Sequence, residues 1–138
     1  MALQRLLVGP DRTALRRGVP AVVLAGVLTA ASTAVVLTSN SGGGVYFPLD
    51  AVAVGVGGAA LYAARYRALA VCLAVGVAAF AGSYVGFHAV AGDEAVLGVL
   101  ARFARDAEGA ALGALAGGVG GAAGSAVGRA LAVRRQRT

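Results

Sequence analysis

The sequence GAALGALAGGVGGAAGSAVG, at positions 109–128, contains the most regular pattern in the chain. Glycine recurs at every fourth position from 109 to 121, and a second series begins at 120. On a helix these glycines gather on one face about 100° wide, whereas the leucines and valines cluster on another. The glycine face consists of Gly113, Gly117, Gly120, Gly121, Gly124 and Gly128. Since a bare face lets a second helix approach closely in lipid, the stretch predicts a membrane-spanning helix made for tight packing.

The same stretch resembles the glycine zippers found in several membrane protein families, some of which oligomerise or form pores. The resemblance covers residues 109–128 and implies a close helix–helix contact. The partner of this face is either another helix of the same chain or a second copy of the chain. Of these two interpretations we favour packing within one helix bundle.

Three more apolar stretches, at about 19–37, 45–64 and 68–90, contain no arginine and have the length of a membrane span. About 20 apolar residues cross a hydrocarbon layer of ~30 Å. Small residues recur in these stretches too, for example Gly82 and Gly86 in the last one. Charged residues make up only 13% of the chain, against about 25% in a soluble domain. We therefore expect a single all-α domain over residues 1–138, an integral membrane four-helix bundle.

Residues 95–108 have a different, amphipathic pattern. Apolar side chains such as Val96, Leu100 and Phe103 share one helical face, and charged side chains occupy the opposite face. This pattern predicts a short amphipathic helix that lies flat on the outer membrane interface with Phe103 in the lipid. Docking of the same helix on a partner subunit is the alternative.

The arginines determine the expected orientation. All 12 basic residues are arginine, and four spans place ten of them on the side that holds both termini, with five of the six acidic residues on the other side. Because cytoplasmic loops are rich in arginine and lysine, we expect a multi-pass protein of the cell membrane with cytoplasmic N- and C-termini. The arginines separate apolar runs instead of gathering on one polar face, so the expected partner is the lipid bilayer and not nucleic acid.

Groups that could carry catalysis or bind a metal are few. The chain has one histidine, His88, and one cysteine, Cys72, and it contains no phosphate-binding loop. We therefore expect no enzyme activity, no cofactor and no metal. Asp50, near the outer end of the second span, fits a helix cap better than a proton or cation ligand.

The chain as a whole resembles the small, uncharacterised multi-span membrane proteins of high-GC prokaryotes, a resemblance that implies no activity. We favour a structural or accessory membrane protein, acting as a homo-oligomer or within a larger membrane complex, because the centres of the spans carry no charge. The alternative is a small channel or transporter for an ion or small solute. Its polar path would be lined by Asp50, Thr29, Thr33 and His88.

Overall fold

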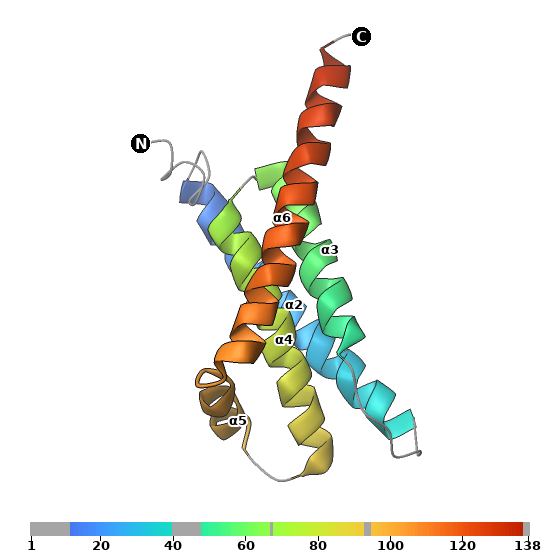
Figure 1. The fold of residues 1–138 in the computed structure, drawn as a ribbon, viewed down its shortest axis with the longest axis vertical. Coiled ribbons are helices and arrows are strands. Elements are labelled where there is room, and N and C mark those ends of the chain that lie inside the picture. The colour runs from blue at the N-terminus through green and yellow to red at the C-terminus, as the bar shows by residue number, and fades with distance from the viewer. Residues whose placement is uncertain (1–11, 40–47, 67, 93–94, 137–138) are drawn as a thin grey trace.

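The computed structural model describes residues 12–39, 48–66, 68–92 and 95–136, and within these ranges the chain forms helices and no strand (Figure 1). The helices are α2 (Arg12–Ser39), α3 (Leu49–Tyr66), α4 (Leu69–Ala91), α5 (Val96–Phe103) and α6 (Ala107–Arg135). The all-α fold expected from the sequence is confirmed for these residues.

The four long helices alternate in direction along the bundle (Figure 1). Helices α2 and α4 are parallel, because Gly18 lies against Val71 and, further along both helices, Ala30 lies against Gly86. The start of α2, the end of α3, the start of α4 and the end of α6 therefore lie together. We call this the arginine-rich end, and the opposite end the α5 end.

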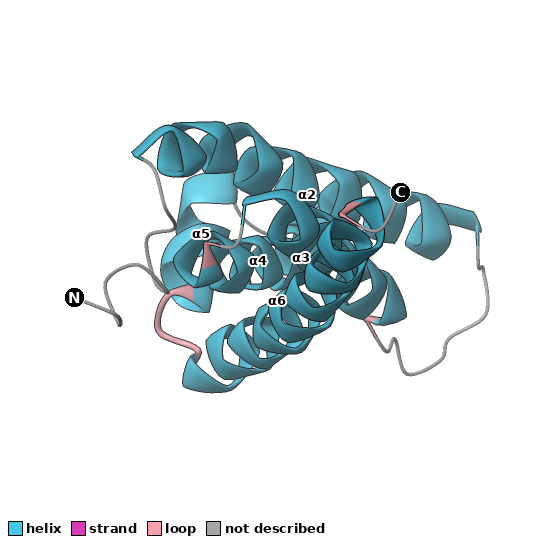
Figure 2. Ribbon diagram, turned by 90° about the horizontal axis from the view of Figure 1, so that it is seen from above, coloured by secondary structure: helices cyan, strands magenta, loops and turns pink. Residues whose placement is uncertain are grey.

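Helix α4 is the central element of the bundle. It packs against α2, α3 and α6, and α2 and α6 lie on opposite sides of it (Figure 2). In their most apolar segments, 50% of the α4 residues are buried, against 17% in α2. The larger buried cluster joins Tyr62 of α3 to Val71, Cys72 and Val75 of α4. Most of α2 and α6 instead presents its side chains to the surroundings of the bundle.

Three helical segments are long and apolar enough to cross a membrane: Arg16–Ser39, Leu69–Ala91 and Ala107–Arg135. These helices indicate a membrane protein. Helix α3, which corresponds to the predicted second span, has 18 residues and carries Asp50 in its first turn and Arg65 in its last. Positions 45–47 of that predicted span lie outside the described residues.

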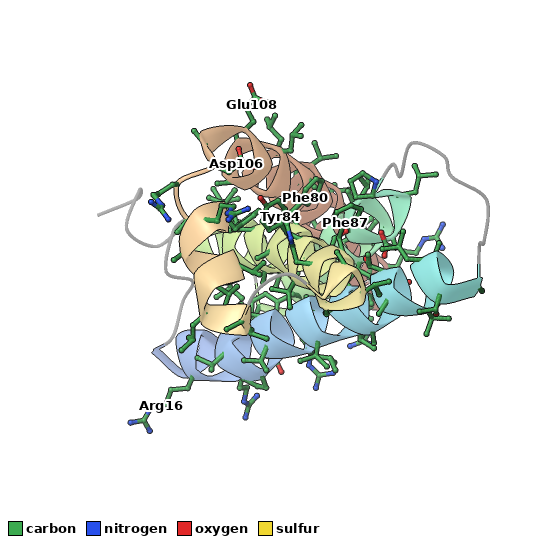
Figure 3. All side chains as sticks on the ribbon, turned by 90° about the horizontal axis from the view of Figure 1, so that it is seen from below. Arg16, Phe80, Tyr84, Phe87, Asp106 and Glu108 are labelled. Carbon is green, nitrogen blue, oxygen red and sulfur yellow. The ribbon has the colours of Figure 1, made fainter. Side chains whose placement is uncertain are left out.

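The amphipathic helix is shorter than the predicted range 95–108. Helix α5 ends at Phe103, and Asp106 caps α6 because its carboxylate accepts hydrogen bonds from the backbone N–H groups of Glu108 (3.1 Å) and Gly109 (3.3 Å). An N-cap residue has a non-helical backbone, so the chain leaves the helix before Asp106. Figure 3 shows Asp106 and Glu108 together at the start of α6.

The expectation that Phe103 enters the lipid is wrong. Phe103 is only 6% exposed and belongs to a buried cluster with Phe80. Its ring centroid lies 5.8 Å from that of Tyr84 on α4. Val99 and Phe103 of α5 therefore pack on the chain's own bundle, Phe103 through an aromatic contact, whereas Val96, Leu97 and Leu100 of the same apolar face stay exposed.

Candidate functional site

The glycine face of α6 lies against two helices of the same chain. Its contacts divide by register: Gly113, Gly117 and Gly121 meet α4, whereas Gly120, Gly124 and Gly128 meet α3. A Cβ atom added to Gly113 would lie 2.7 Å from the Cα of Val77, and one added to Gly124 would lie 2.7 Å from the Cα of Ala60. Backbone atoms cannot yield at such distances without moving a helix. Only glycine therefore allows α6 to lie at its present distance from α3 and α4.

Two glycines of α4 make the same kind of contact with α2. A Cβ atom on Gly82 would lie 2.9 Å from the carbonyl carbon of Gly26, and one on Gly86 would lie 3.1 Å from the carbonyl carbon of Ala30. All eight glycines that the sequence singles out for packing thus lie at contacts between helices of one chain.

A polar cluster joins three helices near the α5 end. The Thr33 hydroxyl of α2 donates to the Asp50 carboxylate of α3, with 2.7 Å between Oγ1 and Oδ2, and lies 3.1 Å from Ser83 Oγ of α4. Thr33 is fully buried, Ser83 is 4% exposed, and Asp50 is partly buried. The close approach of α4 at Gly86 brings α2 and α4 near enough for this bond. The cluster connects α2, α3 and α4 through side-chain hydrogen bonds.

Asp50 also acts on its own helix. Its second carboxylate oxygen, Oδ1, accepts a hydrogen bond of 2.9 Å from the backbone N–H of Ala51, inside the first turn of α3. A negative charge in the first turn is stabilised by the positive end of the helix dipole. Asp50 therefore lies inside the first turn of α3, where it accepts from one backbone N–H group, and it links α3 to α2 in addition.

The other two residues of the predicted polar path lie outside this cluster. Thr29 is fully buried, and its hydroxyl bonds to the carbonyl of Ala25 in its own helix. The His88 ring lies in an aromatic group, with its centroid 4.7 Å from that of Tyr84 and 5.6 Å from that of Phe87. The structure thus brings together two of the four predicted residues.

Ser83 is the member of the cluster that sequence reasoning missed. It shares a helical face with Gly86, three positions later, which contacts α2. A small polar residue on a face made for close contact is a usable signal, because it lies within reach of polar side chains on the neighbouring helix. In the described residues every buried side-chain nitrogen and oxygen has a hydrogen-bond partner, so the cluster leaves no polar atom unsatisfied.

Towards the arginine-rich end the buried side chains are apolar or small. Cys72 is buried there, with its Sγ 3.6 Å from the carbonyl oxygen of Ala59. Among the described residues, no group of three histidine, cysteine, aspartate or glutamate side chains is placed to hold a metal ion. The arrangement offers tight helix contacts and one interhelical hydrogen-bond cluster.

Comparisons of the chain with protein-family models, curated proteins and solved structures gave no match.

Proposed function

We propose that this chain is an integral protein of the cell membrane that crosses the bilayer four times, with both termini in the cytoplasm and a structural or accessory role. The observation that carries the proposal is that small residues form the contacts between helices, whereas large apolar side chains cover the outside of the bundle. The glycine faces are occupied inside the chain, and the exterior presents large apolar side chains. Val23 and Leu28 of α2, Leu61 of α3 and Leu115 of α6 are each more than half exposed. A surface of this kind is rare on a soluble monomer and suits lipid.

The packing of α3 supports a fourth crossing. Along α3, Gly55 lies against Gly76 of α4, and α6 lies against Val56 and, near the other end of α3, against Ala64. Helix α3 thus runs alongside α4 and α6, which are both long and apolar enough to span a membrane. Its 18 residues measure about 27 Å, and a short span is accommodated by slight thinning of the bilayer.

Charge supports the orientation. At the arginine-rich end the described residues include Arg16, Arg17, Arg65, Arg129, Arg134 and Arg135. Arg102 and Arg105 lie at the α5 end together with the three described acidic residues. By the positive-inside rule, the arginine-rich end faces the cytoplasm. Contacts with copies of the chain or with a larger complex would then use the leucine and valine exterior.

Single-cysteine labelling tests the crossings by α3, α4 and α6. In a Cys72→Ser background, Thr38→Cys and Arg65→Cys bracket α3, while Ala95→Cys and Gln136→Cys bracket α6. With a membrane-impermeant maleimide, the cysteines at 38 and 95 are expected to react in intact cells, and those at 65 and 136 only after permeabilisation. Serine suits position 72 because its hydroxyl can donate to the Ala59 carbonyl. Labelling of 38 and 65 from the same side would contradict the crossing by α3.

The second candidate function, transport, is favoured by one observation: the buried Thr33–Asp50–Ser83 cluster, since membrane-embedded acids often mark ion pathways. Reconstitution in liposomes separates the two functions. For a structural or accessory protein we expect H⁺, Na⁺ and K⁺ fluxes equal to those of protein-free liposomes. A flux that is present in the wild type and lost in Asp50→Asn would contradict the structural role and assign the cluster to transport.

A further inference from the structure

Two tyrosine rings of α3 are in contact near the end of the helix. The ring centroids of Tyr62 and Tyr66 lie 5.0 Å apart, with 39° between the ring planes. Tyr62 is only 7% exposed and belongs to the larger buried cluster, and the half-buried Tyr66 packs against that cluster. Aromatic pairs are favourable at such distances, so the buried ring helps to hold the outer one in place. The Tyr66 ring is therefore anchored to the core of the bundle.

Guanidinium groups from two helices lie at this ring, at the arginine-rich end. Arg17 of α2 donates a hydrogen bond of 3.4 Å from Nη1 to the Tyr66 hydroxyl. The Cζ atoms of Arg17 and Arg65 lie 5.9 Å and 5.8 Å from the centroid of the Tyr66 ring. Both arginines are exposed, and each is attracted to the ring by a cation–π contact. One aromatic ring thus holds two positive charges that face the surroundings of the bundle.

The acidic residues that the structure describes do not neutralise this pair. Asp50 and Glu108 lie in the first turns of α3 and α6, and Asp106 caps α6, so all three are at the α5 end. The pair therefore attracts an anion from outside the bundle. A guanidinium group has several N–H donors in a planar fork, and this fork matches the oxygens of a phosphate group. Because those oxygens lie on a tetrahedral centre, two forks can bind one phosphate from different sides.

The pair also bridges two helices that touch each other little. Helix α2 packs mainly on α4, and its contact with α3 is the smallest between any two of the long helices that touch. The Thr33–Asp50 bond joins α2 to α3 near the α5 end, and the Arg17–Tyr66 bond joins them at the arginine-rich end. The second of these bonds is long and exposed, so it is the weaker link. An anion held by Arg17 of α2 and Arg65 of α3 would strengthen the joint at this end.

We propose that Arg17 and Arg65 form a binding site for a phosphate group, and that the bound group fastens α2 to α3 at the arginine-rich end. Two sources supply such a group at a cytoplasmic membrane surface: the headgroup of an anionic phospholipid and the phosphate ion of the cytosol. The inference rests on the proposed function, because it takes the arginine-rich end to lie at that surface. Tyr66 is a positioning residue, since its ring and hydroxyl hold the two arginines together.

Native mass spectrometry of the detergent-purified protein compares palmitoyl-oleoyl phosphatidylglycerol with the matching phosphatidylcholine, whose headgroup has no net charge. Each arginine near an anionic surface contributes about fivefold in affinity. For the double variant Arg17→Gln/Arg65→Gln we therefore expect a loss of about 25-fold in phosphatidylglycerol binding and no change in phosphatidylcholine binding. The control Arg129→Gln/Arg134→Gln removes equal charge at the same end, on α6, and should bind like the wild type. Equal losses in the two double variants would assign the binding to net charge and overturn the site.

Substitution of Tyr66 tests the site without changing the number of positive charges. Tyr66→Leu removes the common partner of the two guanidinium groups, and we expect it to weaken phosphatidylglycerol binding about fivefold, the contribution of one arginine. Tyr66→Phe keeps the ring and loses the hydrogen bond from Arg17, so its affinity should lie between those of Tyr66→Leu and the wild type. If the double arginine variant does not fold, as judged by circular dichroism, Tyr66→Leu decides. Unchanged phosphatidylglycerol binding in Tyr66→Leu would overturn the proposal.

Thermal unfolding, followed by circular dichroism, distinguishes the two sources of phosphate. A ligand that binds only the folded bundle raises its unfolding temperature. For a lipid source, phosphatidylglycerol should raise this temperature in the wild type more than in Arg17→Gln/Arg65→Gln, and sodium phosphate should act like sodium chloride of equal ionic strength. For a free phosphate source, sodium phosphate itself should stabilise the wild type and not the variant. An equal response of the two proteins to both ligands would contradict the site.

Alkaline carbonate extraction of cell membranes separates a failure of this site from a failure of the proposed function. A wild type that is extracted from the membrane contradicts the proposed function itself. A wild type that stays in the membrane, but binds phosphatidylglycerol no better than phosphatidylcholine and gains no stability from phosphate, contradicts only the phosphate site.

Discussion

Replacement of Gly117 by leucine is expected to destabilise the detergent-purified bundle by about 3 kcal/mol or more. A Cβ atom at this position would meet the carbonyl oxygen of Cys72 and lie 3.0 Å from the Cα of Leu73, both on α4. These are backbone atoms of the central helix, so the side chain fits only if α6 moves away. The smaller change Gly117→Ala should cost about 1–3 kcal/mol for the same reason. Thermal unfolding followed by circular dichroism measures both.

The matched control is Gly57→Leu. No atom lies within 4 Å of a Cβ added to Gly57, which is exposed on α3. The same substitution there should be neutral or slightly stabilising, because glycine in a helix interior costs about 0.5–1 kcal/mol relative to alanine. If Gly117→Leu and Gly57→Leu unfold at the same temperature, the glycine face of α6 does not hold the bundle together.

The contact face of α6 could be predicted because the helical period alone decides which glycines share a face, and their missing side chains indicate close approach. The partners of that face could not be predicted. Gly76 illustrates the reason: a Cβ atom on it would lie 2.6 Å from the backbone nitrogen of Gly117, yet it stands on a different face of α4 from Gly82 and Gly86. Helix α4 uses two small faces, one for α6 and one for α2. Which face meets which helix depends on how the helices are placed in the bundle. The spacing of residues within one helix does not determine that placement.

The boundaries of the amphipathic segment show a different limit. Its apolar and charged faces continue in phase through Asp106, so periodicity alone predicts one helix over 95–108. Asp106 can serve either as a side chain on a helix surface or as the residue that ends one helix and caps the next. The second role is the one observed, since its carboxylate accepts two backbone N–H groups of α6. Phe103 then packs against the aromatic ring of Tyr84 on α4. A contact between two separate segments cannot be predicted from the periodicity of one of them.

The polar cluster was predictable in part. Asp50 stands out in sequence because a carboxylate is rare in apolar stretches, and Thr33 is one of the hydroxyl residues of the first stretch. The prediction of His88 and Thr29 in the same path assumed that polar residues of a bundle converge. Instead Thr29 bonds within its own helix, and the His88 ring contacts Tyr84 and Phe87. Each of these two therefore has its contacts away from the Thr33–Asp50–Ser83 cluster.

Thr33→Val is expected to destabilise the bundle by about 1–3 kcal/mol. The substitution keeps the shape of a fully buried side chain and removes the hydroxyl that bonds to Asp50 and lies beside Ser83. Asp50 then loses a hydrogen-bond donor at its carboxylate, and an under-satisfied charged group costs more than a neutral one. Denaturant or thermal unfolding in detergent measures the change.

Thr29→Val is the internal control for this prediction, because Thr29 lies one turn earlier on α2, is also fully buried, and donates to the Ala25 carbonyl of its own helix. That carbonyl already accepts within the helix, so loss of the Thr29 hydroxyl should be close to neutral. Thr33→Ser, which keeps the hydroxyl, should retain more stability than Thr33→Val despite losing a methyl group. Equal destabilisation by Thr33→Val and Thr29→Val would mean that both effects come from helix packing alone. In that case the bond between α2 and α3 adds nothing to the bundle, and the glycine contacts must hold these helices without it.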